Sequence, residues 1–420
     1  MRRSVCLVSP GHVASNPRVV KEADALHGAG YRVTVIAGNE TAFVRRFDEE
    51  IIAQAPWTVV RAGPASLSAR LASRAAKAMA RAWRPRATGF PPWLAVTAYS
   101  AQTSGLTAAA CAVPAELYIA HYVAALPAAA AAAQLHGAAL GYDAEDFHAG
   151  ERASDAGASR EIALVRTIEG KFLPRCLHRT AASPMIAEAY AELYGVELLP
   201  VLNVFPLTEA GEGPAPLRDA DAGQGLSAYW FSQTVGPDRG LQAFIQAMAR
   251  TRARVTLHVR GGDHWGHGKN LVALAQSLQI GDRVELLPME SPFRMIEFAR
   301  QYDVGLSLEA DVSESRRRCL TNKIFTYLLA GRPVLMSDTP AQTALAKDLG
   351  QAAGLVSLSD PATIADQLDR WALSPEALRA AQEAAWQLAR TRYNWQIEQR
   401  AFLASVARAL KQQGKTSCPP

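Results

Sequence analysis

The stretch from residue 303 to residue 338 constrains the fold more than any other part of this 420-residue chain. It opens with an apolar run that is typical of a buried strand, followed by a polar segment and a helical pattern. Thr321 or Asn322 is suited to cap the start of that helix. Gly331 ends the helix, and Pro333 leads the chain into a second apolar strand. The segment therefore predicts a strand–helix–strand unit of an α/β fold.

Basic residues surround the expected start of this helix. Arg316, Arg317, Arg318 and Lys323 lie within eight positions of one another. A helix N-terminus with cations beside it favours phosphate, because the exposed N–H groups and the helix dipole both attract negative charge. An ordinary strand–helix unit with a solvated basic loop fits the same spacing, so both interpretations stand at this point.

The N-terminal half alternates strand and helix patterns. A helix is expected at 18–28, between the first two strands, which predicts a βαβ unit. The strands of this half are expected at 5–8, 31–37, 57–60, 117–120, 138–142, 180–183 and 198–204. Residues 206–225 are rich in proline and glycine, and we expect them to form a linker.

A second alternation follows the linker, so the sequence predicts two parallel-sheet domains in tandem. Its strands are expected at 228–231, 255–260, 284–287, 303–308 and 333–335, and its helices at 240–250, 270–278, 292–301 and from residue 322. Ligands of open α/β sheets bind at the carboxyl ends of the strands. We therefore expect a ligand in a cleft between the two domains.

The composition is that of a globular protein, with 49% hydrophobic and 20% charged residues. Five cysteines are scattered without metal-ligand spacing, which argues against a disulfide framework or a zinc site and favours a reducing cytoplasm. The apolar run at 5–8 is too short for a signal peptide. The alanine-rich run at 123–133 is too short for a membrane span, so neither export nor membrane insertion is expected.

Charge is unevenly distributed along the chain, whose net charge is +5. Residues 51–115 contain no acidic side chain, and a helical pattern within them places five cations on one face: Arg70, Arg74, Lys77, Arg81 and Arg84. Such a face suits docking onto an anionic membrane surface. A solvated face with carboxylate partners elsewhere in the fold is the open alternative. No nucleic-acid motif accompanies the charges, so no nucleic-acid partner is expected.

Residues 322–334 closely resemble a segment of GT-B glycosyltransferases of the glycosyltransferase 4-like group, in which a helix of the form K-[IL]-F-E-Y-x-x-A-G-x-P-V faces the sugar nucleotide. Thr326 stands where that pattern has glutamate. The resemblance implies two Rossmann-like doubly wound domains that face each other across a cleft, with a last helix that crosses back to the first domain. The implied parts are an acceptor-side domain at 1–205, the linker at 206–225, a nucleotide-sugar domain at 226–392 and the last helix at 393–412.

The resemblance also implies the donor-binding residues. In the family an arginine and a lysine bind the diphosphate, and here Gln233 and Arg239 take those places. An arginine suits this task because a guanidinium binds phosphate oxygens bidentately. The remaining implied donor-site positions are Gly11, Gly262, Met289, Thr321, Asn322, Lys323 and Thr326.

A polar cluster at 143–151 directly follows an expected strand of the first domain and resembles the family loop that faces the reacting sugar. The resemblance implies that its side chains position the donor or handle a proton. The candidate catalytic residues are Asp143, Glu145, Asp146 and His148. Arg18 and His121 are candidates for the acceptor pocket. A solvated acidic loop is the alternative.

The predicted function is transfer of a sugar from a nucleoside-diphosphate sugar to a carbohydrate, lipid-linked or small-molecule acceptor, with retention of configuration. The chemistry is expected to need neither metal nor cofactor, since cations replace the metal at the diphosphate. The protein is expected in the cytoplasm, with peripheral contact to the inner membrane face. A GT-B-like sugar-nucleotide epimerase and a catalytically silent nucleotide-sugar-binding scaffold are the alternatives, the latter because Thr326 replaces glutamate. The nucleobase, sugar and acceptor are left open.

Overall fold

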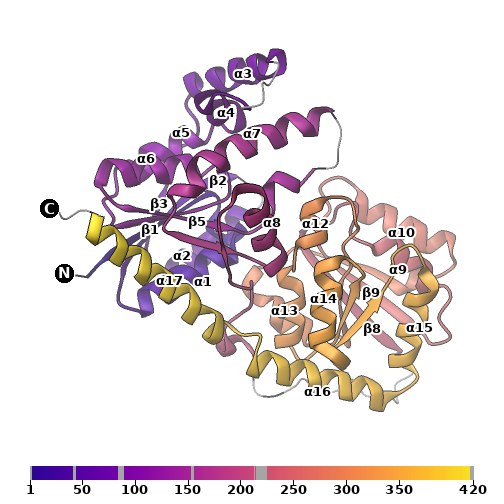
Figure 1. Cartoon of the computed structure of the whole chain (residues 1–420). Helices are drawn as coiled ribbons and strands as arrows, with labels where there is room; N and C mark the ends of the chain where they lie inside the picture. Colours follow the sequence, from indigo (N-terminus) through magenta and orange to yellow (C-terminus); the bar gives the residue numbers. More distant parts are fainter. Residues whose placement is uncertain are drawn as a thin grey trace. The chain divides into compact units, whose positions relative to one another are not determined.

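The computed structural model describes residues 2–40, 44–83, 89–152, 156–211, 213 and 225–416. These fall into two compact units (Figure 1). The first comprises residues up to Leu202 with 313–315 and the chain from Gln399, and the second comprises 203–312 and 316–398. Most of the linker predicted at 206–225 lies outside the described residues.

The first unit is built on a parallel sheet with strand order β3-β2-β1-β4-β5-β6-β7. Its strands are β1 (Ser4–Gly11), β2 (Arg32–Glu40), β3 (Thr58–Arg61), β4 (Leu117–His121), β5 (Ala139–Ala144), β6 (His178–Ala181) and β7 (Leu199–Pro200). Its α-helices before residue 203 are α1 (Pro17–Gly28), α2 (Arg45–Gln54), α3 (Leu67–Ala82), α4 (Pro92–Tyr99), α5 (Thr103–Cys111), α6 (Leu126–His136), α7 (Ala156–Phe172) and α8 (Pro184–Tyr194). The expected βαβ start is confirmed.

Local chemistry explains where α1 begins. The side chain of Asn16 accepts hydrogen bonds from the backbone N–H groups of Arg18 and Val19, and Pro17 occupies the first helical position. Both features favour a helix start, because the first N–H groups of a helix have no partner within it. This cap fixes the first turn of α1, in which Arg18 is buried.

The second unit contains a parallel sheet with strand order β10-β9-β8-β11-β12-β13. Its strands are β8 (Leu226–Thr234), β9 (Val255–Gly262), β10 (Val284–Leu287), β11 (Val304–Ser307), β12 (Val334–Ser337) and β13 (Ala353–Val356). Helices α9 (Leu241–Met248), α10 (His267–Ser277), α11 (Met295–Ala299), α13 (Asn322–Leu329), α14 (Pro340–Leu349), α15 (Pro361–Ala372) and α16 (Pro375–Thr391) accompany them. The predicted doubly wound α/β architecture is thereby confirmed.

Two details of the segment at 303–338 differ from the prediction. The polar segment before α13 contains a short helix, α12 (Glu314–Arg318). Thr321 occupies the cap position of α13, but its side chain caps nothing, because its hydroxyl pairs with that of Ser307 at 3.0 Å. The N-terminus of α13 therefore lacks a side-chain cap.

The last helix, α17 (Trp395–Thr416), belongs to the first unit from Gln399 onward. His178 of β6 lies edge-on to the ring of Phe402, and its Nδ1 is 3.0 Å from the hydroxyl oxygen of Ser405. This confirms the expected return of the C-terminal helix to the first domain. Within the described ranges, none of the helices combines the length and the apolar character required to traverse a bilayer.

Candidate functional site

Five charged side chains gather inside the first unit, where β4 and β5 reach their carboxyl ends. His121 ends β4 and is the register partner of Asp143 in β5. Arg18 and Glu22, one turn apart on α1, lie against them, and Glu145 follows β5. We call these five residues the buried charge cluster. The side chains of all except Glu145 are completely buried.

Asp143 is held by Arg18. The Nε and Nη2 atoms of Arg18 donate to its two carboxylate oxygens at 2.5 and 2.8 Å, and Thr180 donates its hydroxyl to one of the same oxygens. Burial raises the pKa of Asp143, but Arg18 outweighs burial and holds that pKa well below its usual range. Asp143 lies within β5 and its side chain is completely buried, so the prediction that it belongs to the loop after this strand is wrong. Arg18, which was predicted for an acceptor pocket, is completely buried and bound to Asp143.

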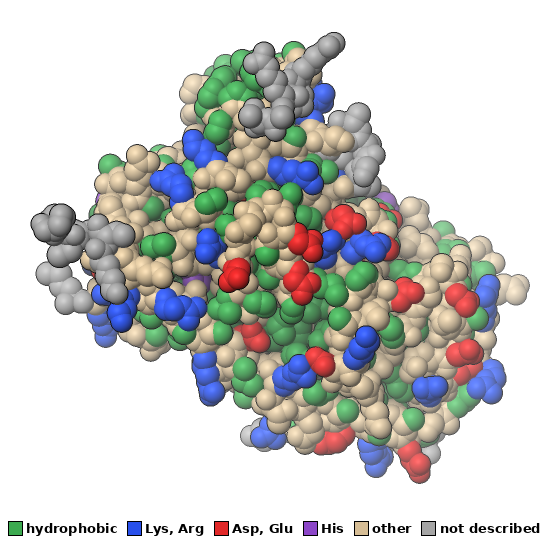
Figure 2. Space-filling view, viewed as in Figure 1, with side chains coloured by type: hydrophobic (Ala, Val, Ile, Leu, Met, Phe, Trp, Pro, Cys, Tyr) green, Lys and Arg blue, Asp and Glu red, His purple; other side chains and the backbone are tan. Residues whose placement is uncertain are grey.

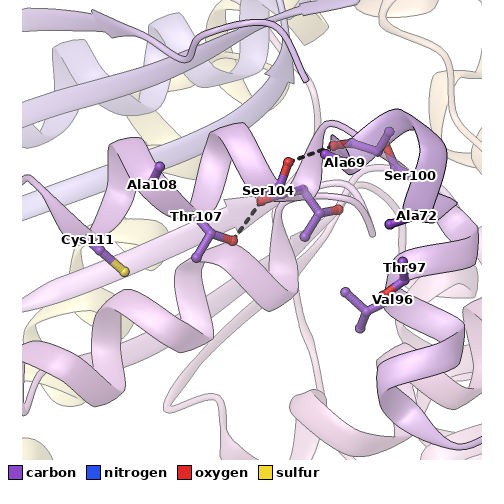
Figure 3. A pocket seen from close by; sticks show the side chains of 11 residues that line it. Ala69, Ala72, Val96, Thr97, Ser100, Ser104, Thr107, Ala108 and Cys111 are labelled. Atoms are coloured by element: carbon purple, nitrogen blue, oxygen red, sulfur yellow. Dashed lines mark hydrogen bonds between the residues drawn. The ribbon is translucent and has the colours of Figure 1, made fainter. Parts of the chain in front are cut away.

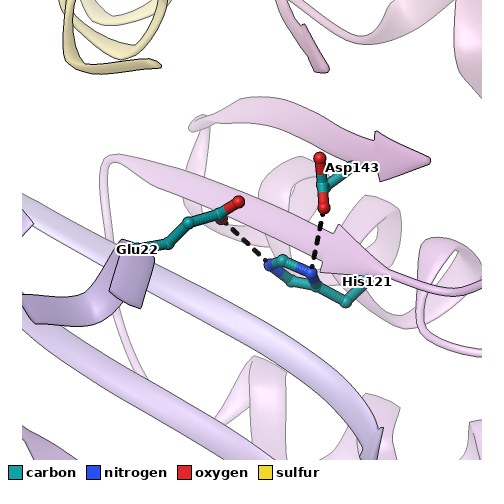
Figure 4. A group of neighbouring side chains, drawn as sticks. All are labelled: Glu22, His121 and Asp143. Carbon is teal, nitrogen blue, oxygen red and sulfur yellow. Dashed lines mark ion pairs between the residues drawn. The ribbon is translucent and has the colours of Figure 1, made fainter. Parts of the chain in front are cut away.

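His121 lies between carboxylates on both sides of its ring. Its Nε2 is 3.2 Å from Glu22, and its Nδ1 is 3.4 Å from Asp143 (Figure 4). The same Nδ1 is 3.0 Å from Glu145. Burial lowers the pKa of His121, whereas these carboxylates, Glu22 foremost, raise it to about 10 overall. The imidazole is therefore a cation at neutral pH, with both ring nitrogens able to donate.

Glu22, His121 and Asp143 also form the one group among the described residues whose ligand atoms are close enough to hold a metal ion. Their chemistry fits an ion-pair network better. Arg18 already places a guanidinium on Asp143 and lies 3.4 Å from Glu22, and the imidazolium of His121 supplies a second positive charge. A cation added to this cluster would meet both charges at short range.

Glu145 is the member of the cluster that reaches toward solvent, with 11% of its side chain exposed. The amide of Asn16 donates to it, and the hydroxyl of Tyr122 donates to its other oxygen at 3.2 Å. Tyr122 has φ of 65°, a conformation that non-glycine residues adopt rarely and often at functional sites. Glu145 is therefore the carboxylate through which this cluster can contact a ligand.

The other two predicted catalytic residues do not join the charge cluster. His148 is buried and places its Nδ1 2.5 Å from Glu151. Burial lowers the pKa of His148, but Glu151 raises it to about 9 overall. Its ring lies 5.6 Å from that of Tyr122, which links it indirectly to Glu145. Asp146 is half-buried, and its backbone carbonyl accepts a hydrogen bond from Tyr190.

The second unit brings three cations to one buried carboxylate. Glu309, just after β11, lies 3.1 Å from Arg239, 2.8 Å from Arg316 and 3.1 Å from Lys323. Burial raises the pKa of Glu309, but Lys323 and the two arginines lower it to about 2 overall. We call Arg239, Arg316 and Lys323 the cation ring. With Glu309 ionised it carries two net positive charges beside the uncapped start of α13.

Three further predicted donor-site residues lie at the same edge of the second sheet, whereas Gly11 ends β1 in the first unit. Gln233 is near the end of β8, Gly262 ends β9, and Met289 follows β10 by two residues. Parallel strands end at a common edge, so these positions and the cation ring border one surface. Thr326 is fully buried and donates its hydroxyl to the carbonyl of Asn322 at 3.1 Å. Its hydroxyl hydrogen is therefore used inside α13.

Sequence reasoning missed several members of these groups. Glu22 follows Arg18 by one helical turn, a spacing that predicts an ion pair. Glu309 stands directly after an apolar strand, which is a common place for a functional side chain in α/β folds. No local sequence pattern marks Tyr122 or Asn16 as a site residue. Both side chains bond Glu145, which lies more than twenty residues away in the sequence.

Comparison with known proteins gives a family-model match for part of the chain. A family model described as glycosyl transferase-like matches residues 239–404, which include the cation ring. No curated protein matches the chain.

Solved structures resemble the whole chain in fold. Anabaena HepE, crystallised with UDP and glucose, has 14% sequence identity and a TM-score of 0.70 over 97% of this chain and 100% of its own. Sucrose-phosphate synthase from Thermosynechococcus elongatus has 14% identity and a TM-score of 0.70 over 98% and 100%. A putative UDP-N-acetylglucosamine 2-epimerase from Listeria monocytogenes is less similar, with 12% identity and a TM-score of 0.60 over 98% of each chain.

Proposed function

We propose that this chain, which has a GT-B fold and matches a glycosyl transferase-like family model over residues 239–404, transfers a sugar from a nucleoside-diphosphate sugar to a carbohydrate, lipid-linked or small-molecule acceptor. The enzyme class predicted from residues 322–334 is confirmed at this level. The glycosyltransferase 4-like group, retention of configuration and independence from metal belong to the proposal.

The observation that carries the proposal is the cation ring. A diphosphate leaving group gains negative charge as the bond to the sugar breaks, so fixed positive charge beside it lowers the barrier. Glu309 keeps Arg239, Arg316 and Lys323 together before the donor arrives, which reduces the cost of assembling them. The start of α13 adds backbone N–H groups. Since HepE was crystallised with UDP and with UDP-glucose, a UDP-sugar is the first donor to test.

The charge cluster of the first unit supports retention. Asp143 is occupied by Arg18 and buried, so it is poorly placed to attack a sugar carbon. In the proposed reaction the acceptor attacks from the leaving-group side and passes its proton to the departing phosphate. Glu145 then orients a sugar hydroxyl, and His121, whose Nδ1 is 3.0 Å from Glu145, holds that carboxylate in place.

The two alternatives have weaker support. Of the three structures compared, that of the epimerase is the least similar to this chain. An epimerase would release an altered free sugar without an acceptor. A silent scaffold is suggested by Thr326, whose buried hydroxyl does not replace the glutamate of the family pattern. Product analysis separates transfer from epimerisation.

A thermal-shift titration with UDP, GDP, ADP, TDP and CMP tests donor binding directly. We expect one nucleoside diphosphate to raise the melting temperature, because a ligand that binds only the folded state stabilises it by mass action. Ligand at 100 times its Kd contributes roughly 2.7 kcal/mol of stability. If no nucleotide shifts the melting temperature of the folded protein at millimolar concentration, the transferase proposal fails. Stabilisation by a nucleotide without turnover of its sugar would instead favour the silent scaffold.

A second part of the proposal concerns membrane docking through helix α3, which carries the predicted membrane-facing cations. Arg70, Arg74, Lys77 and Arg81 are all exposed, while the fifth cation, Arg84, lies outside the described residues. Ion pairs between the described residues involve none of these four cations. The predicted alternative, a face paired with carboxylates elsewhere, therefore lacks support in the described part of the fold.

The outer surface of α3 is apolar beside the cations. Its inner face buries only Ser73, Ala76 and Ala80, whereas Leu67 is 74% and Leu71 54% exposed. Figure 2 shows hydrophobic side chains gathered over α3 and α4, with Lys and Arg side chains next to them. A helix with an exposed apolar stripe and a basic flank favours the interface of an anionic membrane. We infer that this unit docks peripherally on such a membrane.

Binding to vesicles checks the docking. Wild-type protein should bind phosphatidylglycerol-containing vesicles more tightly than pure phosphatidylcholine vesicles, and Lys77→Gln should weaken that binding about fivefold, because each cation near an anionic surface contributes about 1 kcal/mol. Lys347→Gln, on the exposed side of α14, is the matched control and should change nothing. Equal losses for both variants, or equal binding to neutral vesicles, would contradict the assignment to α3.

A further inference from the structure

An apolar pocket of about 560 Å³ lies in the first unit among α3, α4 and α5 (Figure 3). Its volume is within the range of about 300–1,000 Å³ that is usual for small-molecule sites. It has no part in the charge cluster or the cation ring. Its lining residues are Ala69 and Ala72 from α3, Val96 and Thr97 from α4, Ser100 and Ala101 from the connection, and Thr103, Ser104, Thr107, Ala108 and Cys111 from α5.

The walls of this pocket present little hydrogen-bonding capacity to a ligand, although several lining residues have hydroxyl groups. Thr97, Ser104 and Thr107 donate their hydroxyls to carbonyls of their own chain segment three or four residues earlier. Thr103 donates to the carbonyl of Ala124. With these hydrogens used, mainly methyl and methylene groups remain to line the space. Such walls suit hydrocarbon rather than a sugar or a nucleotide.

The position of the pocket on α3 relates it to the membrane-facing stripe. At 100° per residue, Ala72 lies about 120° around α3 from the middle of the exposed apolar stripe formed by Leu67 and Leu71, with the exposed side chain of Met79 between them. Ala69 lies on the opposite, inner face of the helix. The cations occupy the opposite side of that stripe. A bilayer that receives the stripe would thus have lipid headgroups at the cations and hydrocarbon next to the pocket.

The pocket also extends toward the functional edge of the sheet. Thr103 bonds Ala124, three residues beyond His121 at the carboxyl end of β4, whereas Cys111 lies eight residues further along α5. Eight helical residues span roughly 12 Å. An extended chain in this pocket would therefore run from the edge that carries the charge cluster toward the opposite edge of the sheet.

We propose that this pocket binds the hydrocarbon chain of a lipid-linked acceptor, so that the acceptor class is a membrane lipid with a polar head to be glycosylated. The inference rests on the proposed transferase function and narrows its acceptor. The apolar stripe of α3 brings the lipid from the bilayer, and the pocket holds its chain while the head remains at the carboxyl edge of the sheet.

Cys111 provides a direct readout, since it is half-exposed and lines the pocket, whereas the other described cysteines are buried. In a Cys418→Ser background, the alkylation rate of Cys111 would be followed by intact mass with butyl, hexyl and octyl glucoside below their micelle concentrations. We expect the half-protecting concentration to fall about fourfold per added methylene, because each buried methylene is worth about 0.8 kcal/mol.

Two variants that fill the pocket should remove this chain-length dependence: Ala108→Trp from α5 and the milder Ala72→Phe from α3. Ala380→Trp adds the same bulk on the exposed side of α16, away from the pocket and from the stripe of α3, and should keep the chain-length dependence. Protection that is independent of chain length, or unaffected by both pocket variants, overturns the inference. A thermal shift with a nucleoside diphosphate is measured on the same preparations. If the nucleotide still raises the melting temperature, the pocket inference alone has failed and the transferase proposal stands.

Discussion

Replacement of Asp143 by alanine is expected to destabilise the first unit by about 3–5 kcal/mol, because it leaves buried cations without their carboxylate. Arg18 loses both of its strong hydrogen bonds to Asp143, and Thr180 loses an acceptor. Total stabilities of domains are about 5–15 kcal/mol, so this loss is a large share. Urea denaturation followed by circular dichroism measures it, with the midpoint falling at an unchanged slope.

A double-mutant cycle tests the cause of that loss. Arg18→Met combined with Asp143→Leu removes both charges and keeps comparable volume, so the double variant should lose far less stability than the two single variants together. Additive losses would show that Arg18 and Asp143 act independently. A loss below about 1 kcal/mol for Asp143→Ala would mean that Glu22 alone suffices to neutralise Arg18.

Replacement of Arg239 by alanine is expected to weaken nucleoside-diphosphate binding by roughly 1.5–3 kcal/mol, which is about 10- to 150-fold in Kd. The physical reason is the loss of a charge-assisted contact to the diphosphate. About a fifth of the Arg239 side chain is exposed, so within the cation ring only Arg316 is more accessible to a ligand. Isothermal titration calorimetry with the stabilising nucleotide measures the change. Folding should be little affected, because Arg316 and Lys323 still neutralise Glu309.

Two controls sharpen this result. Arg379→Ala removes an exposed arginine from α16 of the same unit and should leave affinity unchanged. Arg239→Lys keeps the charge but not the bidentate geometry, so an intermediate loss is expected. Unaltered affinity of Arg239→Ala would remove this residue from the diphosphate site and shift the assignment to Arg316 and Lys323.

The regular elements were largely predictable from local patterns. Apolar runs at 5–8 and 117–120 lie in β1 and β4, because inner strands of a parallel sheet are buried on both faces and are therefore apolar throughout. The alternation of these runs with helical segments predicted two doubly wound units. A strand was predicted at 198–204, but the structure has only the two-residue edge strand β7 there, which pairs with β6.

The ion pairs were less predictable, because charged residues inside a strand look like a loop until their partners are known. Asp143 belongs to β5, and its charge is tolerated there because Arg18, 125 positions earlier, is buried against it. Glu309 likewise depends on Arg239, 70 positions earlier. No local rule relates residues at such separations.

By itself, the sequence determined the α/β alternation, the glycosyltransferase resemblance around α13 and the basic, acid-free segment that contains α3. Each follows from neighbours along the chain, where periodicity and short motifs act. Only the tertiary structure decided which charges meet, that Arg18 is a buried partner of Asp143, and that α3 exposes an apolar stripe beside a pocket. These depend on which faces of distant elements pack together, since burial and pairing are properties of the assembled fold.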